Sequence, residues 1–313
     1  MRRMKTVLGV VAVIFIVAPQ AQGYYLGHHT KGSWGLASGT QPGAGLYVAP
    51  IYTRYSADKI IKADGEELNV TGLDKKITVN AGTLFGWWVS PYDIAGADYG
   101  AMVMAPFMSN TLEFASFKFD SSLGISDVYV RPANLGWHMK QADVMAGYGL
   151  YLPTGRYEDG ASDNRGMGMW THEFLAGTTV YFDGERKWHA SATAFVELNS
   201  KKKDSETKVG EILTVEGGVG RSFLGGGVNV GAAYYGQWKL SYDTIDAGPL
   251  GTVKPLHRNR VYGLGPEVTL PVVAKQRLIA LVTARYQWEL GARSTLEGET
   301  FNVFATFPFL TGQ

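Results

Sequence analysis

The chain has 313 residues, of which 45% are hydrophobic and 18% are charged, with a formal net charge of +1 and no cysteine. This balance excludes an intrinsically disordered chain, and the lack of cysteine excludes disulfide frameworks, cysteine-ligated zinc and thiol nucleophiles. Only one long apolar run is present, so a membrane protein built from several helical spans of about 20 apolar residues is excluded as well.

The first 23 residues are predicted to be a secretory signal peptide. Basic residues at the start precede an apolar run over residues 7–18, and the small residues Ala21 and Gly23 predict cleavage before Tyr24. An uncleaved anchor is the alternative, but this run is too short to cross a bilayer. Removal of the segment takes the formal net charge from +1 to −2, so nucleic acid is not an expected partner.

Residues 24–44 form a glycine-rich segment that carries His28, His29 and Trp34 ahead of the first predicted strand. Two placements are open for it. It folds into the lumen of a barrel formed by residues 45–313 as a partial plug, or it is a disordered lead in the periplasm.

From residue 45 onward, apolar and polar residues alternate with a period of two. In residues 278–290 the apolar set from Leu278 to Leu290 alternates with Thr283, Arg285 and other polar residues, which indicates a strand with two different surroundings. Segments of this kind are predicted at residues 45–56, 78–91, 98–108, 125–137, 141–154, 170–183, 188–200, 209–222, 226–240, 258–272, 277–290 and 301–309. Most exceed the usual sandwich strand of about 5–6 residues and suit a membrane β-strand of about 9–11.

The connections between these twelve segments give a second, independent indication. Long gaps such as 57–77 and 155–169 alternate with short ones such as 138–140, and the last gap, 291–300, is of moderate length. Long extracellular loops and short periplasmic turns produce this rhythm, with both chain termini in the periplasm. The fold class is therefore predicted to be all-β, a transmembrane antiparallel up-and-down barrel of about 12 strands in the outer membrane of a Gram-negative bacterium.

Aromatic residues lie near the ends of the predicted strands, where membrane interfaces are expected. They are Trp87, Trp88, Trp137, Trp170, Trp188, Trp238, Trp288, Phe307 and Phe309. The last strand, FNVFATFPF, resembles the aromatic C-terminal signal that the barrel assembly machinery reads, which makes that machinery an expected partner.

The residues that alternate with the apolar ones along each strand are polar, and they are expected to face the lumen. The lumen candidates are Asp127, Arg131, Glu173, Glu197, Glu267, Arg285 and Glu289. Two interpretations stay open: these charges pair with one another across a narrow lumen, or they form a constriction that selects permeants by charge and size.

The loop at residues 155–169 is either a solvated loop or a gate that folds into the lumen. Its candidate residues are Arg156, Tyr157, Asp159, Asp163, Asn164 and Arg165. The order of its carboxylates does not match an EF-hand calcium loop, and no metal or cofactor is predicted. A basic loop tip at residues 201–203 is either solvated or in contact with lipopolysaccharide phosphates.

No nucleophile elbow, zinc-protease or phosphate-loop motif is present, and the histidines are scattered. An outer-membrane hydrolase assembled from His138, His172, His189 or His257 with a nearby serine is one alternative, since triads are spatial. A soluble exported β-protein that binds a ligand through aromatic residues is another.

Four blocks, in order along the chain, carry a family resemblance. They are SDVYVRPANLGW (residues 126–137), GYGLYLPTGRY (147–157), YGLGPEVTLPV (262–272) and RYQWELGARSTLEGETF (285–301). Together they resemble the transporter family labelled for the meta-pathway of phenol degradation, over about residues 45–310. The resemblance implies a passive outer-membrane channel for small hydrophobic or aromatic molecules, with outer-membrane lipid and lipopolysaccharide around it.

Overall fold

The computed structural model describes residues 26–68, 75–114, 117–159, 161, 163–246, 252–253 and 257–309. The predicted signal peptide and its cleavage position lie outside the described residues. Among the described residues, no helix is both long and apolar enough to cross a membrane.

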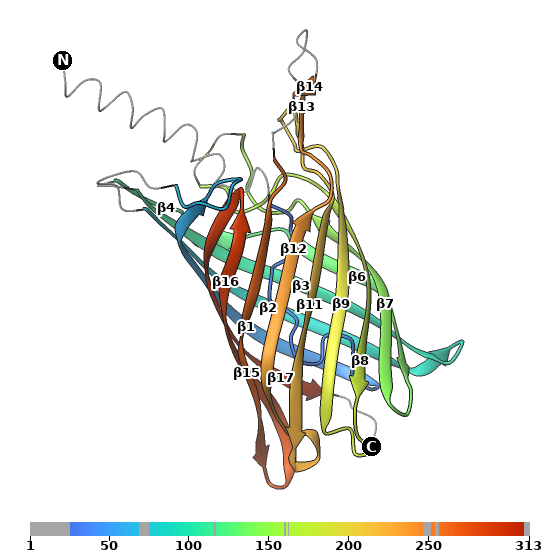
Figure 1. The fold of residues 1–313 in the computed structure, drawn as a ribbon. Coiled ribbons are helices and arrows are strands. Elements are labelled where there is room, and N and C mark those ends of the chain that lie inside the picture. The colour runs from blue at the N-terminus through green and yellow to red at the C-terminus, as the bar shows by residue number, and fades with distance from the viewer. Residues whose placement is uncertain are drawn as a thin grey trace, which may run out of the picture.

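Twelve antiparallel strands form a closed barrel (Figure 1). Their bounds are β1 (Gly45–Ile61), β2 (Lys75–Ile94), β3 (Ala97–Phe114), β6 (Val128–His138), β7 (Ala142–Leu152), β8 (Thr171–Tyr181), β9 (Trp188–Asn199), β11 (Ile212–Phe223), β12 (Val228–Lys239), β15 (Arg260–Ala274), β16 (Arg277–Arg293) and β17 (Thr295–Phe309). Each strand pairs with its neighbours in chain order, and the pairing of β1 with β17, from Leu46 opposite Phe309 to Ile61 opposite Thr295, closes the barrel. The predicted barrel and all twelve predicted strands are confirmed.

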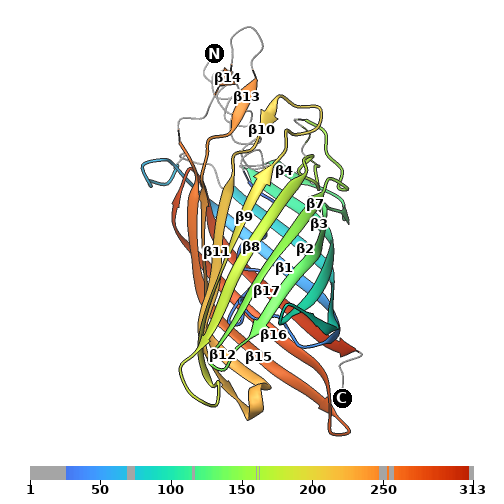
Figure 2. The same ribbon diagram turned by 90° about the vertical axis from the view of Figure 1, so that its right-hand side faces the viewer.

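The two ends of the barrel differ. Short turns, such as the one after β2 at Ala95 and Gly96, lie at the end where β17 finishes, and we call this the turn end. The opposite loop end carries the long connections and five short strands: β4 (Phe117–Asp120), β5 (Gly124–Ile125), β10 (Thr207–Lys208), β13 (Thr244–Asp246) and β14 (Thr252–Val253). The last three form a small sheet that projects beyond the barrel (Figure 2). A single 3-10 turn, η1 (Leu224–Gly226), lies at the turn end.

The predicted connection at residues 291–300 is wrong. Strand β16 continues to Arg293 and β17 begins at Thr295, so only Ser294 separates them, with a positive φ of 52°. The predicted strands at 277–290 and 301–309 leave these residues between them. They continue the two strands instead, because β1 and β17 remain paired up to this level.

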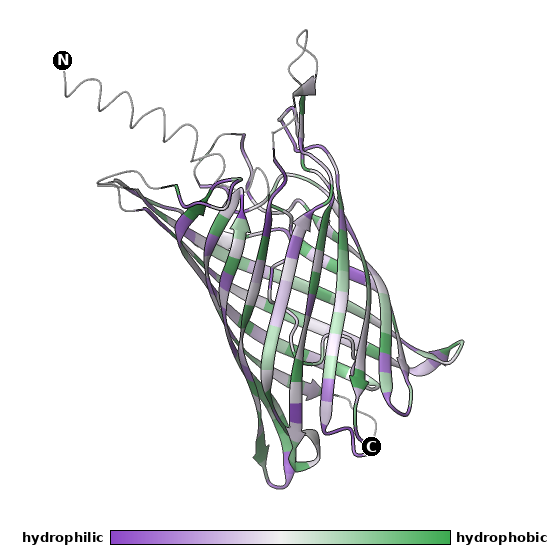
Figure 3. Cartoon of the chain, in the orientation of Figure 1, coloured by the Kyte–Doolittle hydropathy of each residue, from purple (hydrophilic) through white to green (hydrophobic). Residues whose placement is uncertain are grey.

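The alternation along each strand separates lumen from outer wall, and Figure 3 shows the resulting change between hydrophilic and hydrophobic residues along the strands. On β16, Thr283, Arg285 and Gln287 are buried, whereas Trp288 and Leu290 are half exposed on the outside. Since the polar set faces inward, the barrel presents the apolar outer wall that a bilayer requires.

Five of the nine predicted aromatic positions are exposed, and Trp87 is buried. Trp88, Trp188 and Phe309 near the turn end and Trp170 and Trp288 near the loop end are exposed on the outer wall, which fits interfacial girdles. Trp87 is a correction: it is 6% exposed and faces the lumen, because it has the opposite parity to its neighbour Trp88.

Candidate functional site

The lumen contains the N-terminal segment, residues 26–44, which runs between the two ends of the barrel. Near the loop end, the His28 ring contacts Thr171, the first residue of β8 (Nδ1 to Oγ1, 2.7 Å). Near the turn end, the Thr40 hydroxyl contacts Thr179 on the same strand (Oγ1 to Oγ1, 2.9 Å). Of the two placements left open by the sequence, the described residues follow the one inside the barrel. The first described residues therefore lie near the loop end, contrary to the expectation that places both chain termini at the periplasmic turn end.

His29 is a buried side chain of this segment. Its Nδ1 contacts Glu173 on β8 at 2.8 Å and its Nε2 contacts Glu216 on β11 at 3.1 Å. Two carboxylates on opposite ring nitrogens require both nitrogens to donate, so the ring is an imidazolium. Burial lowers the pKa of His29, but the carboxylates of Glu173 and Glu216 outweigh burial and raise it to about 10.

Wall carboxylates also satisfy the backbone of the segment. Glu197 Oε1 accepts the backbone N–H groups of His28 at 2.6 Å and His29 at 3.0 Å. Glu216 accepts those of Gly32 and Trp34, each at 2.7 Å. Buried N–H groups need acceptors, and an irregular segment has no strand ladder to provide them. The wall carboxylates accept these hydrogen bonds where a neighbouring strand would otherwise do so.

The middle of the segment packs closely against β15 and β16. Lys31 donates to Glu289 at 2.5 Å, and Arg285 pairs with Glu267 at 2.6 Å while donating to the Gly32 carbonyl at 2.5 Å. Gly32 has a positive φ of 71°, a conformation that favours glycine. A Cβ at Gly35 would lie 1.9 Å from Glu267 Oε2, so a larger residue there would displace the Glu267–Arg285 pair.

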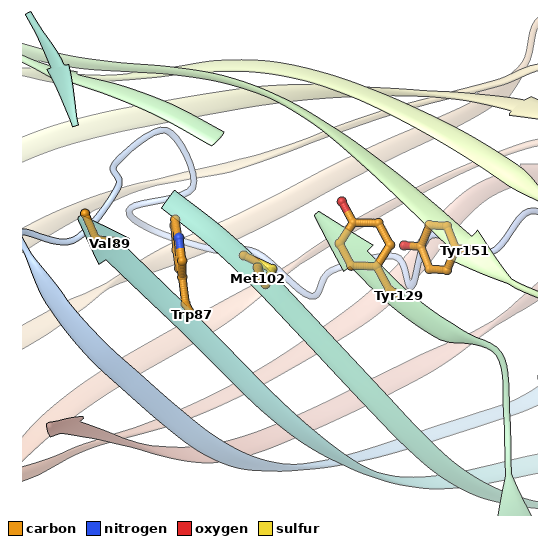
Figure 4. Packing of buried hydrophobic residues seen from close by; sticks show 5 residues of the cluster. All are labelled: Trp87, Val89, Met102, Tyr129 and Tyr151. Carbon is orange, nitrogen blue, oxygen red and sulfur yellow. The ribbon is translucent and has the colours of Figure 1, made fainter. Parts of the chain in front are cut away.

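Aromatic side chains line one side of the lumen (Figure 4). The cluster comprises Trp87, Val89, Met102, Tyr129 and Tyr151, with Trp34 of the N-terminal segment packed against it. Trp34 lies edge-on to Trp87 with ring centroids 6.0 Å apart, and the Arg131 guanidinium lies 4.9 Å from the Trp34 ring centre. This side of the lumen combines a cation–π contact with apolar rings.

At the turn end, hydroxyl and amide groups hold the segment. Ser38 Oγ lies 3.2 Å from Ser191 Oγ on β9, and Thr40 donates to Asp143 on β7 at 3.0 Å. Gln41 accepts from Asn134 on β6 at 2.5 Å. Neutral contacts thus dominate here, whereas charged contacts dominate toward the loop end.

All seven lumen candidates from the sequence are buried, and each contacts the N-terminal segment: Asp127 and Glu197 at His28, Glu173 at His29, Glu289 at Lys31, Arg285 at Gly32, Arg131 at Trp34 and Glu267 at Leu36. Pairing within the wall also occurs, as between Arg131 and Glu173 at 3.6 Å. The sequence reasoning missed Glu216 and Tyr235, although both have the inward parity of their strands.

The candidate gating loop is bound to itself and to Asp127. Arg156 pairs with Asp163, and Tyr157 donates to Asp159 at 3.2 Å. The Asn164 side chain accepts from the Glu158 backbone N–H and donates to the Glu158 carbonyl, and Arg165 donates to the Ser122 carbonyl at 3.0 Å. Asp127 accepts the backbone N–H groups of Gly155 at 2.9 Å and Met167 at 2.6 Å, and its Oδ2 also contacts His28 Nε2 at 2.9 Å. One carboxylate therefore joins this loop to the N-terminal segment.

The four histidines weighed for a hydrolase lie apart. His138 contacts Asp143, His172 contacts the Tyr148 hydroxyl, and His189 contacts the Lys187 carbonyl. His257 is exposed. Within the described ranges none of these rings is bonded to a serine hydroxyl, and no group of three metal-ligating side chains is found there.

Comparison with known proteins identifies the family. Residues 57–304 match the family described as “Putative MetA-pathway of phenol degradation”. The chain belongs to this family. Its fold is similar to the crystal structure of the COG4313 outer membrane channel from Pseudomonas putida F1, with a TM-score of 0.74 and 16% identity over 90% of this chain and 100% of that one.

More distant barrels match with lower scores. The translocator domain of the autotransporter NalP from Neisseria meningitidis has a TM-score of 0.49 and 13% identity, covering 86% of this chain and 90% of that one. A TodX monoaromatic hydrocarbon channel mutant has a TM-score of 0.47 and 10% identity, covering 87% and 91%. No curated protein matches by sequence.

Proposed function

We propose that this family member is an outer-membrane channel for passive uptake of small molecules and that residues 26–44 are its gate. The observation that carries the proposal is the contact of this segment with all seven charged wall residues named above. A segment held by side chains alone can leave without breaking the barrel, whose strand ladders close independently of it. The protein then acts by diffusion and not by catalysis.

Small aromatic compounds are the proposed permeants. The lumen cluster with Trp87, Tyr129 and Tyr151 offers ring faces and edges to a flat apolar solute. The Arg131 guanidinium, now over Trp34, is available to another ring or to a phenolic oxygen once that residue moves. The description of the family, a phenol degradation pathway, agrees with this substrate class.

The loop at 155–169 is proposed to move with the segment, because Asp127 holds both. Barrel assembly machinery is the proposed partner during insertion, and lipopolysaccharide is the proposed neighbour of the loop end. The basic tip with Lys201 and Lys203, both exposed, faces that level.

A reversible lock tests the gate. Ser38 and Ser191 have hydroxyl oxygens 3.2 Å apart, within reach of a disulfide after replacement of both by cysteine, and the chain has no other cysteine. In liposomes, oxidised S38C/S191C protein should transport phenol more slowly than either single variant, and reductant should restore the rate. Equal rates before and after reduction, with the disulfide verified by mass, would refute a moving gate.

A further inference from the structure

A groove on the outer wall crosses β1, β2 and β3, away from the lumen. Its volume is about 410 Å³, and Leu123 from the connection after β3 overhangs it with 71% of its surface exposed. At its centre Tyr52 and Phe107 lie on either side of Gly82, which is opposite both of them in the strand register. A Cβ at Gly82 would meet no heavy atom within 4 Å, so the floor of the groove is open.

The surface that lines the groove is mainly apolar. Toward the turn end it continues over Leu84, which is 55% exposed, and Pro50 opposite it. Its few polar groups lie toward the loop end, where Asn80 accepts from the Tyr52 hydroxyl at 2.9 Å and Ser109 is opposite Asn80. An occupant with an apolar chain and a polar head at the loop side fits this order.

Arg54 lies at the polar end and supplies a positive charge. It is exposed on the outer face, and its cross-strand neighbours, Asn80 and Phe301, are uncharged. Farther along β1, Lys59 is already paired with Glu297 at 3.4 Å. Arg54 itself is in no ion pair with any residue that the structure describes. An outward arginine on a barrel wall is favourable where it meets an anion at the headgroup level.

The height of Arg54 on the barrel wall matches the level of the lipid headgroups. Nine steps of about 3.3 Å along β1 from Gly45, tilted by about 40°, rise about 23 Å. This is close to the apolar band of about 25 Å in outer-membrane barrels, so Arg54 reaches the headgroups of the outer leaflet while the groove lies among the acyl chains.

We propose that this groove binds one lipopolysaccharide molecule, with an acyl chain between Tyr52 and Phe107 and a lipid A phosphate on Arg54. A phosphate accepts hydrogen bonds in the forked geometry that a guanidinium donates. The inference rests on the proposed outer-membrane location and not on transport, so it stands if the channel activity fails. Location is checked separately, by fractionation of the outer membrane.

The test uses the full processed chain, delipidated in detergent and titrated with purified lipid A. We expect saturable binding that Arg54→Ser and Gly82→Leu each weaken by about tenfold, the first by removing the cation and the second by filling the floor. Matched controls are Arg221→Ser, which removes an exposed outer-wall arginine at the turn end, and Gly86→Leu, which adds the same side chain on β2 outside the groove. Both controls should bind lipid A like the wild type.

Three results would overturn the proposal: equal affinity in all four variants, equal affinity for phosphatidylethanolamine, or displacement of lipid A by millimolar inorganic phosphate alone. Resistance of the unheated barrel to unfolding in detergent verifies that each variant is folded. A variant that fails this check is replaced by Arg54→Gln or Gly82→Val, which are milder changes at the same positions.

Discussion

Replacement of Glu216 by glutamine should open the channel. Glu216 is fully buried and accepts three hydrogen bonds from the N-terminal segment, from His29 Nε2 at 3.1 Å and from the backbone N–H groups of Gly32 and Trp34 at 2.7 Å each. Glutamine has one acceptor oxygen instead of two, and its NH₂ group faces an N–H donor of the N-terminal segment in place of the second oxygen. At least one hydrogen bond is lost, and the others lose their ionic character.

The magnitude follows from these contacts. A hydrogen bond to a charged group contributes about 1.5–3 kcal/mol, and ionised partners make such bonds about twice as strong as neutral ones. Loss of one bond and weakening of the rest should destabilise the closed state by about 3 kcal/mol, which corresponds to about a 100-fold rise in the ratio of open to closed protein. The barrel itself should remain folded, since β11 keeps its ladder to β9 and β12.

Single-channel recording in a planar bilayer measures this ratio directly. Thr214→Ala is the matched control, because Thr214 lies two residues away on the same face and bonds to Gln237, not to the N-terminal segment. If E216Q and T214A show the same open probability as the wild type, the contacts of Glu216 do not hold the gate and the reasoning fails.

Three further predictions concern the same gate. First, His29 has a pKa of about 10 in the folded protein, above its ordinary 6.5, so its contribution to closure is complete below pH 6.5 and is lost as the pH rises through 10. The open probability should therefore increase over that interval, and His29→Gln should abolish the increase. Arg285→Ala should raise flux of small solutes in liposome swelling, because it removes the charged donor that Glu267 and the Gly32 carbonyl share, and unchanged swelling by assembled protein would count against it. Asp127→Asn should loosen the 155–169 loop and the N-terminal segment together, seen as faster hydrogen exchange in both; exchange in only one would separate them.

The barrel could be predicted because each strand faces two different surroundings. Alternation along residues 278–290 places Arg285 and Trp288 on opposite faces, and the structure keeps them there. Strand ends were less predictable. The predicted strands stop at Leu290 and resume at Phe301, whereas pairing with β1 extends β17 to Thr295. The small sheet of β10, β13 and β14 joins loops that are far apart in the chain, and no local pattern signals it.

The wall of the site was predictable for the same reason, but its occupant was not. The alternation along β8 and β16 is enough to predict that Glu173 and Glu289 face the lumen, and both are buried there. The N-terminal segment has no period, and its contacts join residues far apart in sequence, such as Lys31 with Glu289. Whether a glycine-rich segment enters a lumen depends on acceptors supplied by distant strands, so sequence reasoning left two placements open. Glu216 carries the inward parity of β11 and could have been found by the same rule.

The chemistry of the closed state favours reversibility. An apolar plug would leave the carboxylates of Glu197 and Glu216 buried without the donors that the segment supplies, at a cost of several kcal/mol. The N-terminal segment instead supplies an imidazolium and free backbone N–H groups, the donors that carboxylates require. When the segment leaves, water can replace those donors on the carboxylates. In both states these carboxylates have hydrogen-bond donors. The free-energy difference between the two states then depends on a few hydrogen bonds, which a permeant or a change of pH can shift.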